Sequence, residues 1–122
     1  MEIKKVVVIG SGTMGSGIAA QICNANIPVT LLDLKTEISE KAKDRIYKSR
    51  PPLLLDKSKI NNINAGNISD DFHVVKDADW IVEAVVERID VKHNIYQKIF
   101  RERKKGAIVS SNTSSIPIKV LS

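Results

Sequence analysis

A glycine-rich segment near the start of the chain limits the possible folds more than any other feature. The segment VVVIGSGTMGSG places Gly10-x-Gly12-x-x-Gly15 directly after an apolar, β-branched run and at the start of a helical pattern. Such a run predicts a parallel strand that is buried on both faces. Gly10 would permit the tight turn, Gly12 the close approach of a pyrophosphate, and Gly15 the packing of helix on strand. The segment therefore predicts a dinucleotide-binding unit, with phosphates at the helix N-terminus.

An acidic residue at the end of the second apolar run supports this interpretation. Asp33 closes the segment PVTLLD about twenty residues after the glycines, where a carboxylate can accept hydrogen bonds from ribose hydroxyls. A 2′-phosphate would meet this negative charge, so the pattern favours NAD over NADP, although Lys35 lies close by in the sequence. The alternative is a glycine-rich turn followed by an acid that only caps a helix.

Apolar runs and helical patterns alternate along the whole chain, without an internal repeat or a dividing linker. The expected long helices cover 14–25, 36–48 and 91–103, and the expected strands are KKVVVIG, PVTLLD, 80–86 and AIVSS. This order predicts an α/β fold, namely a Rossmann-type doubly wound parallel sheet with right-handed crossovers, truncated at its C-terminal side.

Local signals predict the finer boundaries. Apolar spacing puts Met14, Ile18, Ile22 and Ala25 on the inner face of the first helix. Two prolines bar a helix interior in SRPPLLLDKS, so Leu53 to Leu55 should pack as a loop. Asp56 should cap a short helix through Ile60, NAGN should form a turn, and Ser69 or Asp70 should cap a second short helix that runs to Lys76. Asp90 should cap the long helix 91–103, and Gly106 should end it. A further helix should begin near Pro117.

Composition restricts the setting of the protein. With 122 residues the chain forms at most one domain, and the single Cys23 excludes an intramolecular disulfide, which suits a reducing, cytoplasmic compartment. No apolar run approaches the ~18 residues that span a bilayer.

The net charge is +5, and part of the excess lies in RERKK, residues 101–105. We interpret this run as a solvated helix C-terminus, because the chain has no nucleic-acid motif and no set of stacking aromatics.

The third apolar strand carries charged residues where ligands of open α/β sheets bind. In ADWIVEAVVERIDVK, Glu83 and Glu87 flank the C-terminal end of the strand, and Lys92 lies one turn into the next helix. On periodicity alone, Glu87 and Lys92 would be solvated charges at the start of a helix.

Three segments together resemble a known family. VVVIGSGTMGSGIA, WIVEAVVERIDVK and SSNTSS are similar, in order and spacing, to the NAD-binding domain of 3-hydroxyacyl-CoA dehydrogenases, the enzymes of fatty-acid β-oxidation. The resemblance covers nearly all of the chain. The stretch KSRPPLLLD is most similar to the long bacterial members, in which the dehydrogenase is fused to an enoyl-CoA hydratase-like region. Another dehydrogenase with the same glycine fingerprint would not account for the second and third segments together.

The resemblance implies a role for each matching position, and it implies no metal site. Asp33 would bind the adenosine ribose, and Ser49 would contact coenzyme A. Ser114 would face both the nicotinamide and the 3-hydroxyl of the substrate, donating to the oxygen that becomes the keto group, while Asn112 and Thr113 shape the turn. The pyrophosphate would lie on Gly10, Ser11, Gly12, Thr13, Met14 and Gly15, and the nicotinamide ribose on Ala84, Glu87 and Lys92.

The family also implies catalytic groups that we do not expect within residues 1–122. Its base is a histidine oriented by a glutamate, about twenty residues beyond the NTSS loop, with a supporting asparagine later. Neither His73 nor His93 matches that position. We therefore expect residues 1–122 to be an incomplete NAD-binding domain without the helical substrate and dimerisation domain, inactive unless a further segment or a partner chain completes it. The alternative is a non-catalytic fragment that at most binds NAD.

Overall fold

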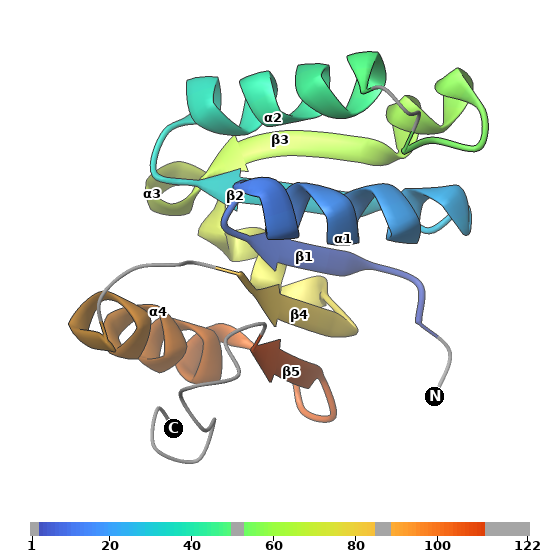
Figure 1. The fold of residues 1–122 in the computed structure, drawn as a ribbon. Coiled ribbons are helices and arrows are strands. Elements are labelled where there is room, and N and C mark those ends of the chain that lie inside the picture. The colour runs from blue at the N-terminus through green and yellow to red at the C-terminus, as the bar shows by residue number, and fades with distance from the viewer. Residues whose placement is uncertain (1–2, 50–52, 85–88, 112–122) are drawn as a thin grey trace.

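The computed structural model describes residues 3–49, 53–84 and 89–111. They form a five-stranded, all-parallel sheet in the order β3-β2-β1-β4-β5 (Figure 1). The strands are β1 (Val6–Ile9), β2 (Val29–Asp33), β3 (Ile63–Asn67), β4 (Trp80–Glu83) and β5 (Ile108–Ser111). This order places β1 at the centre, where its continuous apolar run is buried on both faces. The predicted α/β fold with a parallel sheet is confirmed.

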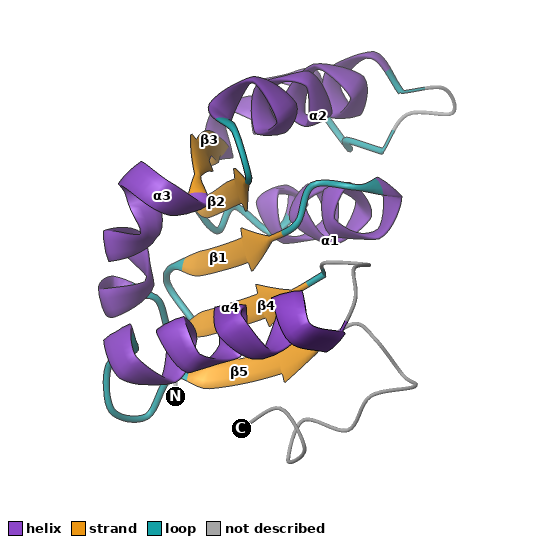
Figure 2. Cartoon of the chain, turned by 90° about the vertical axis from the view of Figure 1, so that its left-hand side faces the viewer, coloured by secondary structure: helices purple, strands orange, loops and turns teal. Residues whose placement is uncertain are grey.

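Helices cover both faces of the sheet. The helices α1 (Thr13–Asn24) and α2 (Thr36–Lys48) lie on one face, and α3 (Ile68–Asp71), the 3₁₀ segment η2 (Phe72–Asp77) and α4 (Ile89–Glu102) lie on the other (Figure 2). A short 3₁₀ segment, η1 (Lys57–Asn62), leads from the end of α2 into β3. The change of face between β3 and β4 is what a doubly wound sheet requires, because right-handed crossovers in opposite directions leave the sheet on opposite sides.

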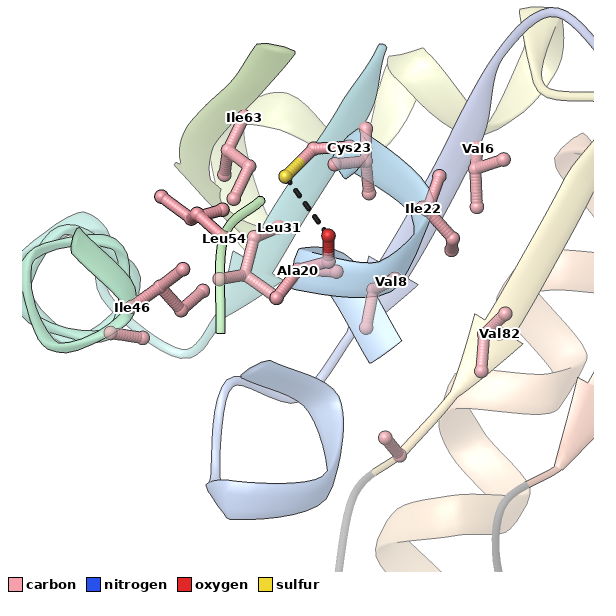
Figure 3. Packing of buried hydrophobic residues seen from close by; sticks show 14 residues of the cluster. Val6, Val8, Ala20, Ile22, Cys23, Leu31, Ile46, Leu54, Ile63 and Val82 are labelled. Atoms are coloured by element: carbon pink, nitrogen blue, oxygen red, sulfur yellow. Dashed lines mark hydrogen bonds between the residues drawn. The ribbon is translucent and has the colours of Figure 1, made fainter. Parts of the chain in front are cut away.

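The two faces bury separate hydrophobic cores, and the strands supply them alternately. On the α1 and α2 face, Val6 and Val8 pack with Leu31, Ile46 and Ile63 (Figure 3). Their neighbours Val7 and Ile9 point the opposite way, into a core completed by residues of η2 and α4, among them Phe72, Val75, Ile95 and Ile99. This alternation follows from the two-residue period of a strand.

Several sequence expectations agree with the structure. Helix α2 has the predicted bounds, and the described part of the third apolar run is a strand that ends at Glu83. Residues 53–56 form a loop, as expected for the proline-rich stretch, but of Leu53 to Leu55 only Leu54 is buried. Asp56 accepts a hydrogen bond from the Ser58 N–H at the start of η1, as expected. The helix expected at Pro117 lies outside the described residues.

The turn expected at NAGN is wrong, because these residues belong to strand β3. Ile63 is buried and the strand pairs residue by residue with β2, from Val29 to Asp33. Asn and Gly are depleted in strands, so local propensity predicted a turn, but pairing with the interior strand β2 outweighs propensity. The following helix is capped by Asn67, whose side-chain oxygen accepts from the Asp70 N–H, and not by Ser69 or Asp70.

Three details of the expected helices are also wrong. Met14 and Ala25 are exposed, whereas Ile22 is buried and Ile18 packs against the core as expected. Ala19, Ala20 and Cys23, which the apolar spacing did not include, are also buried. Helix α4 begins at Ile89, so Asp90 lies in its first turn and does not precede it as a cap. Gly106 lies four residues beyond the end of α4, in a separate turn with a φ of 90°.

A buried carboxylate joins the chain start to the region after α4. Asp79 Oδ2 accepts from the backbone N–H groups of Lys4 at 2.8 Å and Lys5 at 3.1 Å, and Asp79 Oδ1 accepts from Lys104. These hydrogen bonds lower the pKa of Asp79 to about 2, and the bond from the Lys104 ammonium has the largest effect. Lys104 belongs to the basic run RERKK, and Arg103 of the same run lies over the Phe100 ring and donates to the Ala107 carbonyl. These two cations thus have structural contacts within the domain.

None of the helices in the described ranges is long and apolar enough to cross a membrane.

Candidate dinucleotide-binding site

The glycine loop lies at the edge of the sheet where the parallel strands end (Figure 2). Gly10 follows β1 with a φ of 105°, a conformation that side chains rarely adopt, and its N–H donates to the Leu32 carbonyl at 2.8 Å. A Cβ at Gly15 would lie 1.8 Å from the Gly10 carbonyl oxygen. The loop can therefore turn back onto its own strand only with glycine at both positions.

The start of helix α1 offers backbone donors next to open space. Gly12 is the N-cap residue and has no side chain to accept from the first-turn N–H groups. It is exposed, and a Cβ at this position would meet nothing within 4 Å. An anion can therefore approach the backbone here, where the helix dipole adds positive potential. Met14 is 53% exposed beside it, and the side chain of Thr13 lies outside the described residues.

Asp33, at the end of β2, contacts the glycine loop through Ser11. Its Oδ2 accepts from the Ser11 N–H at 2.8 Å and from the Ser11 hydroxyl at 2.5 Å, and its Oδ1 accepts from the Leu34 N–H at 2.7 Å. These three donors hold the carboxylate at the rim of the loop. Asp33 is the last residue of β2, and the two residues before it, Leu31 and Leu32, are buried. The predicted proximity of Asp33 and the glycine segment is thus present in the structure.

The end of β4 forms the neighbouring part of the edge. Ile9 pairs with Glu83, and the Ala84 N–H donates to the Ile9 carbonyl at 2.8 Å, so Ala84 lies next to the glycine loop. Both Glu83 and Ala84 are buried. Glu87, Ser114 and the side chain of Lys92, which the sequence analysis placed beside them, lie outside the described residues. Ser49 is the half-buried C-cap residue of α2.

Two contacts of this site were not apparent in the sequence. The Ser11 carbonyl oxygen accepts from Arg45 Nη2 of α2 at 3.0 Å and from the Ser16 hydroxyl of α1 at 2.9 Å. Arg45 is one of several cations on a polar helix and lies 34 residues from Ser11 in the sequence. No local sequence pattern therefore predicts that these two residues are in contact. In the described ranges, no group of three or more His, Cys, Asp or Glu side chains could hold a metal ion.

The parallel sheet, the glycine turn at its carboxyl edge and the acid at the end of β2 define a dinucleotide-binding domain of the Rossmann type. Comparison with known families agrees: residues 5–122 match the family described as 3-hydroxyacyl-CoA dehydrogenase, NAD binding domain. The chain belongs to this family, and its cofactor is NAD.

Individual relatives show the same relationship. The chain is 42% identical over 125 residues to a Deinococcus radiodurans protein named "Probable 3-hydroxyacyl-CoA dehydrogenase", covering 97% of this chain and 36% of the relative. It is 44% identical over 127 residues to a Rickettsia felis protein whose name describes a fatty acid oxidation complex trifunctional enzyme, covering 98% of this chain and 18% of the relative. The chain thus spans about a third or less of the length of these two relatives.

Solved structures agree with the sequence comparison. The fold matches a 3-hydroxybutyryl-CoA dehydrogenase of Escherichia coli with a TM-score of 0.83 and 28% identity, over 99% of this chain and 27% of that chain. It matches the (S)-3-hydroxybutyryl-CoA dehydrogenase of Ralstonia eutropha with a TM-score of 0.79 and 30% identity, over 98% of this chain and 44% of that chain.

Proposed function

We propose that residues 1–122 form the cofactor-binding part of an NAD-dependent 3-hydroxyacyl-CoA dehydrogenase. The observation that carries the proposal is the pair of hydrogen bonds from Ser11 to Asp33, which joins the glycine loop to the acid 22 residues away. The exposed Gly12 backbone at the start of α1, where no described residue accepts from its N–H, and the open space beside it fit a pyrophosphate. The Asp33 carboxylate fits a ribose with free hydroxyls and disfavours a 2′-phosphate.

The remaining positions complete the proposal along the edge of the sheet. Ala84, Glu87 and Lys92 would line the nicotinamide-ribose side, and Ser114 would lie between the nicotinamide and the substrate. The half-buried Ser49, at the end of α2, would contact coenzyme A. The cofactor bound in this way would supply the acceptor for a hydride.

The reaction we propose for the whole protein is the oxidation of a (3S)-3-hydroxyacyl-CoA to the 3-ketoacyl-CoA, within fatty-acid β-oxidation. The hydride leaves C3 and the hydroxyl proton goes to a base, while the Ser114 hydroxyl donates to the oxygen as it becomes a carbonyl. We propose that the base is a histidine supplied from outside residues 1–122, together with a helical substrate domain. His73 does not fit that role, because it lines a cavity with Lys5 and Pro28, at the opposite edge of the sheet.

Calorimetric titration of the purified chain with NADH tests the cofactor site directly. We expect a dissociation constant in the micromolar range, about −8 kcal/mol, and binding at least about tenfold weaker in Asp33→Ala. Asp44→Ala is the matched control, because Asp44 is an exposed acid of α2 that pairs only with Lys48 among the described residues, and its loss changes the net charge equally. NADPH should bind the wild-type chain less tightly than NADH.

Two results would count against the proposal. Equal weakening by Asp33→Ala and Asp44→Ala would mean that net charge, and not the ribose contact, governs affinity. A folded chain that does not bind NADH would exclude a working cofactor site in residues 1–122. The reaction itself is tested by following NADH oxidation with a 3-ketoacyl-CoA, using the chain together with the segment or partner that completes it.

A further inference from the structure

Both peptide groups of Ser11 are held by side chains from other elements. The N–H of the first peptide donates to Asp33, as described above. The carbonyl of the second peptide accepts two hydrogen bonds, from Arg45 Nη2 at 3.0 Å and from Ser16 Oγ at 2.9 Å. Ser11 is only 2% exposed, so these partners replace water on its backbone.

Fixing the Ser11 carbonyl also fixes the direction of the next N–H. A peptide bond is planar and trans, so the carbonyl oxygen of Ser11 and the N–H of Gly12 point in opposite directions. Because the oxygen points toward Arg45 and Ser16, the Gly12 N–H points away from α2, and no described residue accepts from it. A Cβ at Gly12 would meet nothing within 4 Å, so there is open space beside this residue.

Arg45 suits this role better than a neutral donor would. A guanidinium forms stronger hydrogen bonds than a neutral group and brings a positive charge close to the loop. Helix α2 is anchored independently of it, because Ala42 and Ile46 are buried and the Ser39 hydroxyl donates to the Gly66 carbonyl at 2.7 Å. Loss of the arginine contact should therefore alter the loop without unfolding the helix.

We propose that Arg45 is a positioning residue for cofactor binding: it orients the Ser11–Gly12 peptide so that the Gly12 N–H faces the pyrophosphate. The inference rests on the proposed function, since it assigns a role within the same site. It adds a third element, α2, to a phosphate site otherwise built from the glycine loop and α1.

The test compares the wild-type chain with Arg45→Met, Arg45→Lys and the control Lys41→Met. Lys41 lies one turn earlier on α2 and is exposed, and its side chain makes no hydrogen bond or ion pair with any residue that the structure describes. Each Met variant removes one positive charge and keeps a long side chain. We expect the NADH dissociation constant to rise about tenfold in Arg45→Met, partly recover in Arg45→Lys, and change less than about twofold in Lys41→Met.

Nuclear magnetic resonance of the free chain supplies a readout that does not depend on NADH. The Gly12 amide resonance should shift, and its hydrogen exchange should accelerate, in Arg45→Met but not in Lys41→Met, with equal urea midpoints for the two variants. Unchanged Gly12 signals in Arg45→Met, or unchanged NADH affinity while the wild type binds, would overturn the role of Arg45 alone. Equal losses in both Met variants would also overturn it, in favour of a general charge effect. A wild type that does not bind NADH would instead remove the proposed function.

Discussion

Replacing Gly15 by alanine should destabilise the domain, although alanine is the better helix former. A Cβ at this position would lie 1.8 Å from the Gly10 carbonyl oxygen and 2.9 Å from its carbonyl carbon. Real Cβ contacts are essentially never shorter than 3.0 Å, so helix and loop must separate by more than about 1 Å. The obstacle is backbone and not a flexible side chain, so no rotamer change relieves it.

The magnitude follows from two opposing effects. Alanine in a helix interior is favoured over glycine by up to about 1 kcal/mol. Overpacking costs typically about 1–3 kcal/mol and more when backbone must shift. We expect the overlap with Gly10 to dominate, for a net loss of about 2 kcal/mol or more and a melting temperature lower by about 8 °C or more.

Gly17→Ala is the matched control within the same helix. A Cβ at Gly17 would meet nothing within 4 Å, and Gly17 lies in the interior of α1. The same chemical change should therefore stabilise the chain by about 0.5–1 kcal/mol, raising the melting temperature by about 2–4 °C. Urea denaturation and thermal unfolding, followed by circular dichroism, give the free energies of unfolding for the wild type and both variants.

The refuting result is a Gly15→Ala chain that is as stable as Gly17→Ala. That outcome would mean that α1 does not approach the end of β1 as closely as the structure has it. A destabilised Gly17→Ala would also contradict the reasoning, because it would show a contact where the structure has open space.

Two further predictions concern the loop after α2 and the start of β4. Leu54→Ala should cost about 2–4 kcal/mol of unfolding free energy and Leu55→Ala less than about 0.5, in urea titrations, since Leu54 is 7% exposed and Leu55 is 82% exposed; similar losses would contradict this packing. The pKa of Asp79 is lowered to about 2 by Lys104 and two N–H groups, so its stabilising effect should be complete above about pH 4 and disappear as the pH falls toward 2. In urea titrations across this range, the midpoint of the wild type should fall more steeply than that of Asp79→Asn, and parallel curves would show that Asp79 does not govern acid stability.

Much of the fold could be predicted because its signals are local. The apolar runs before Gly10 and Asp33 are buried strands, and α2 has the predicted bounds from Thr36 to Lys48. In each case a few consecutive residues show the apolar pattern of the strand or helix and the residues that end it. These elements could therefore be predicted without knowing which distant residues they contact.

The expectations that failed depended on neighbours far away in the chain. INAGN has poor strand propensity, yet it forms β3 because Ile63 is buried and the segment pairs with β2. The apolar spacing placed Ile18 and Ile22 of α1 correctly against the core but wrongly added Met14 and Ala25, which are exposed, because spacing alone does not settle how the helix is rotated on the sheet. Periodicity alone leaves that rotation open when apolar residues such as Met14 and Ala25 lie on more than one side.

The amino-acid sequence by itself determined the alternation of strands and helices apart from β3, the glycine turn and the acid at the end of β2. Only the tertiary structure decided which polar groups meet, as with Arg45 and Ser11 or Asp79 and Lys4, which lie 34 and 75 residues apart. The physical reason is that periodicity reports a residue's own burial, whereas a hydrogen bond between distant residues depends on the order of the strands and on the face that each helix covers.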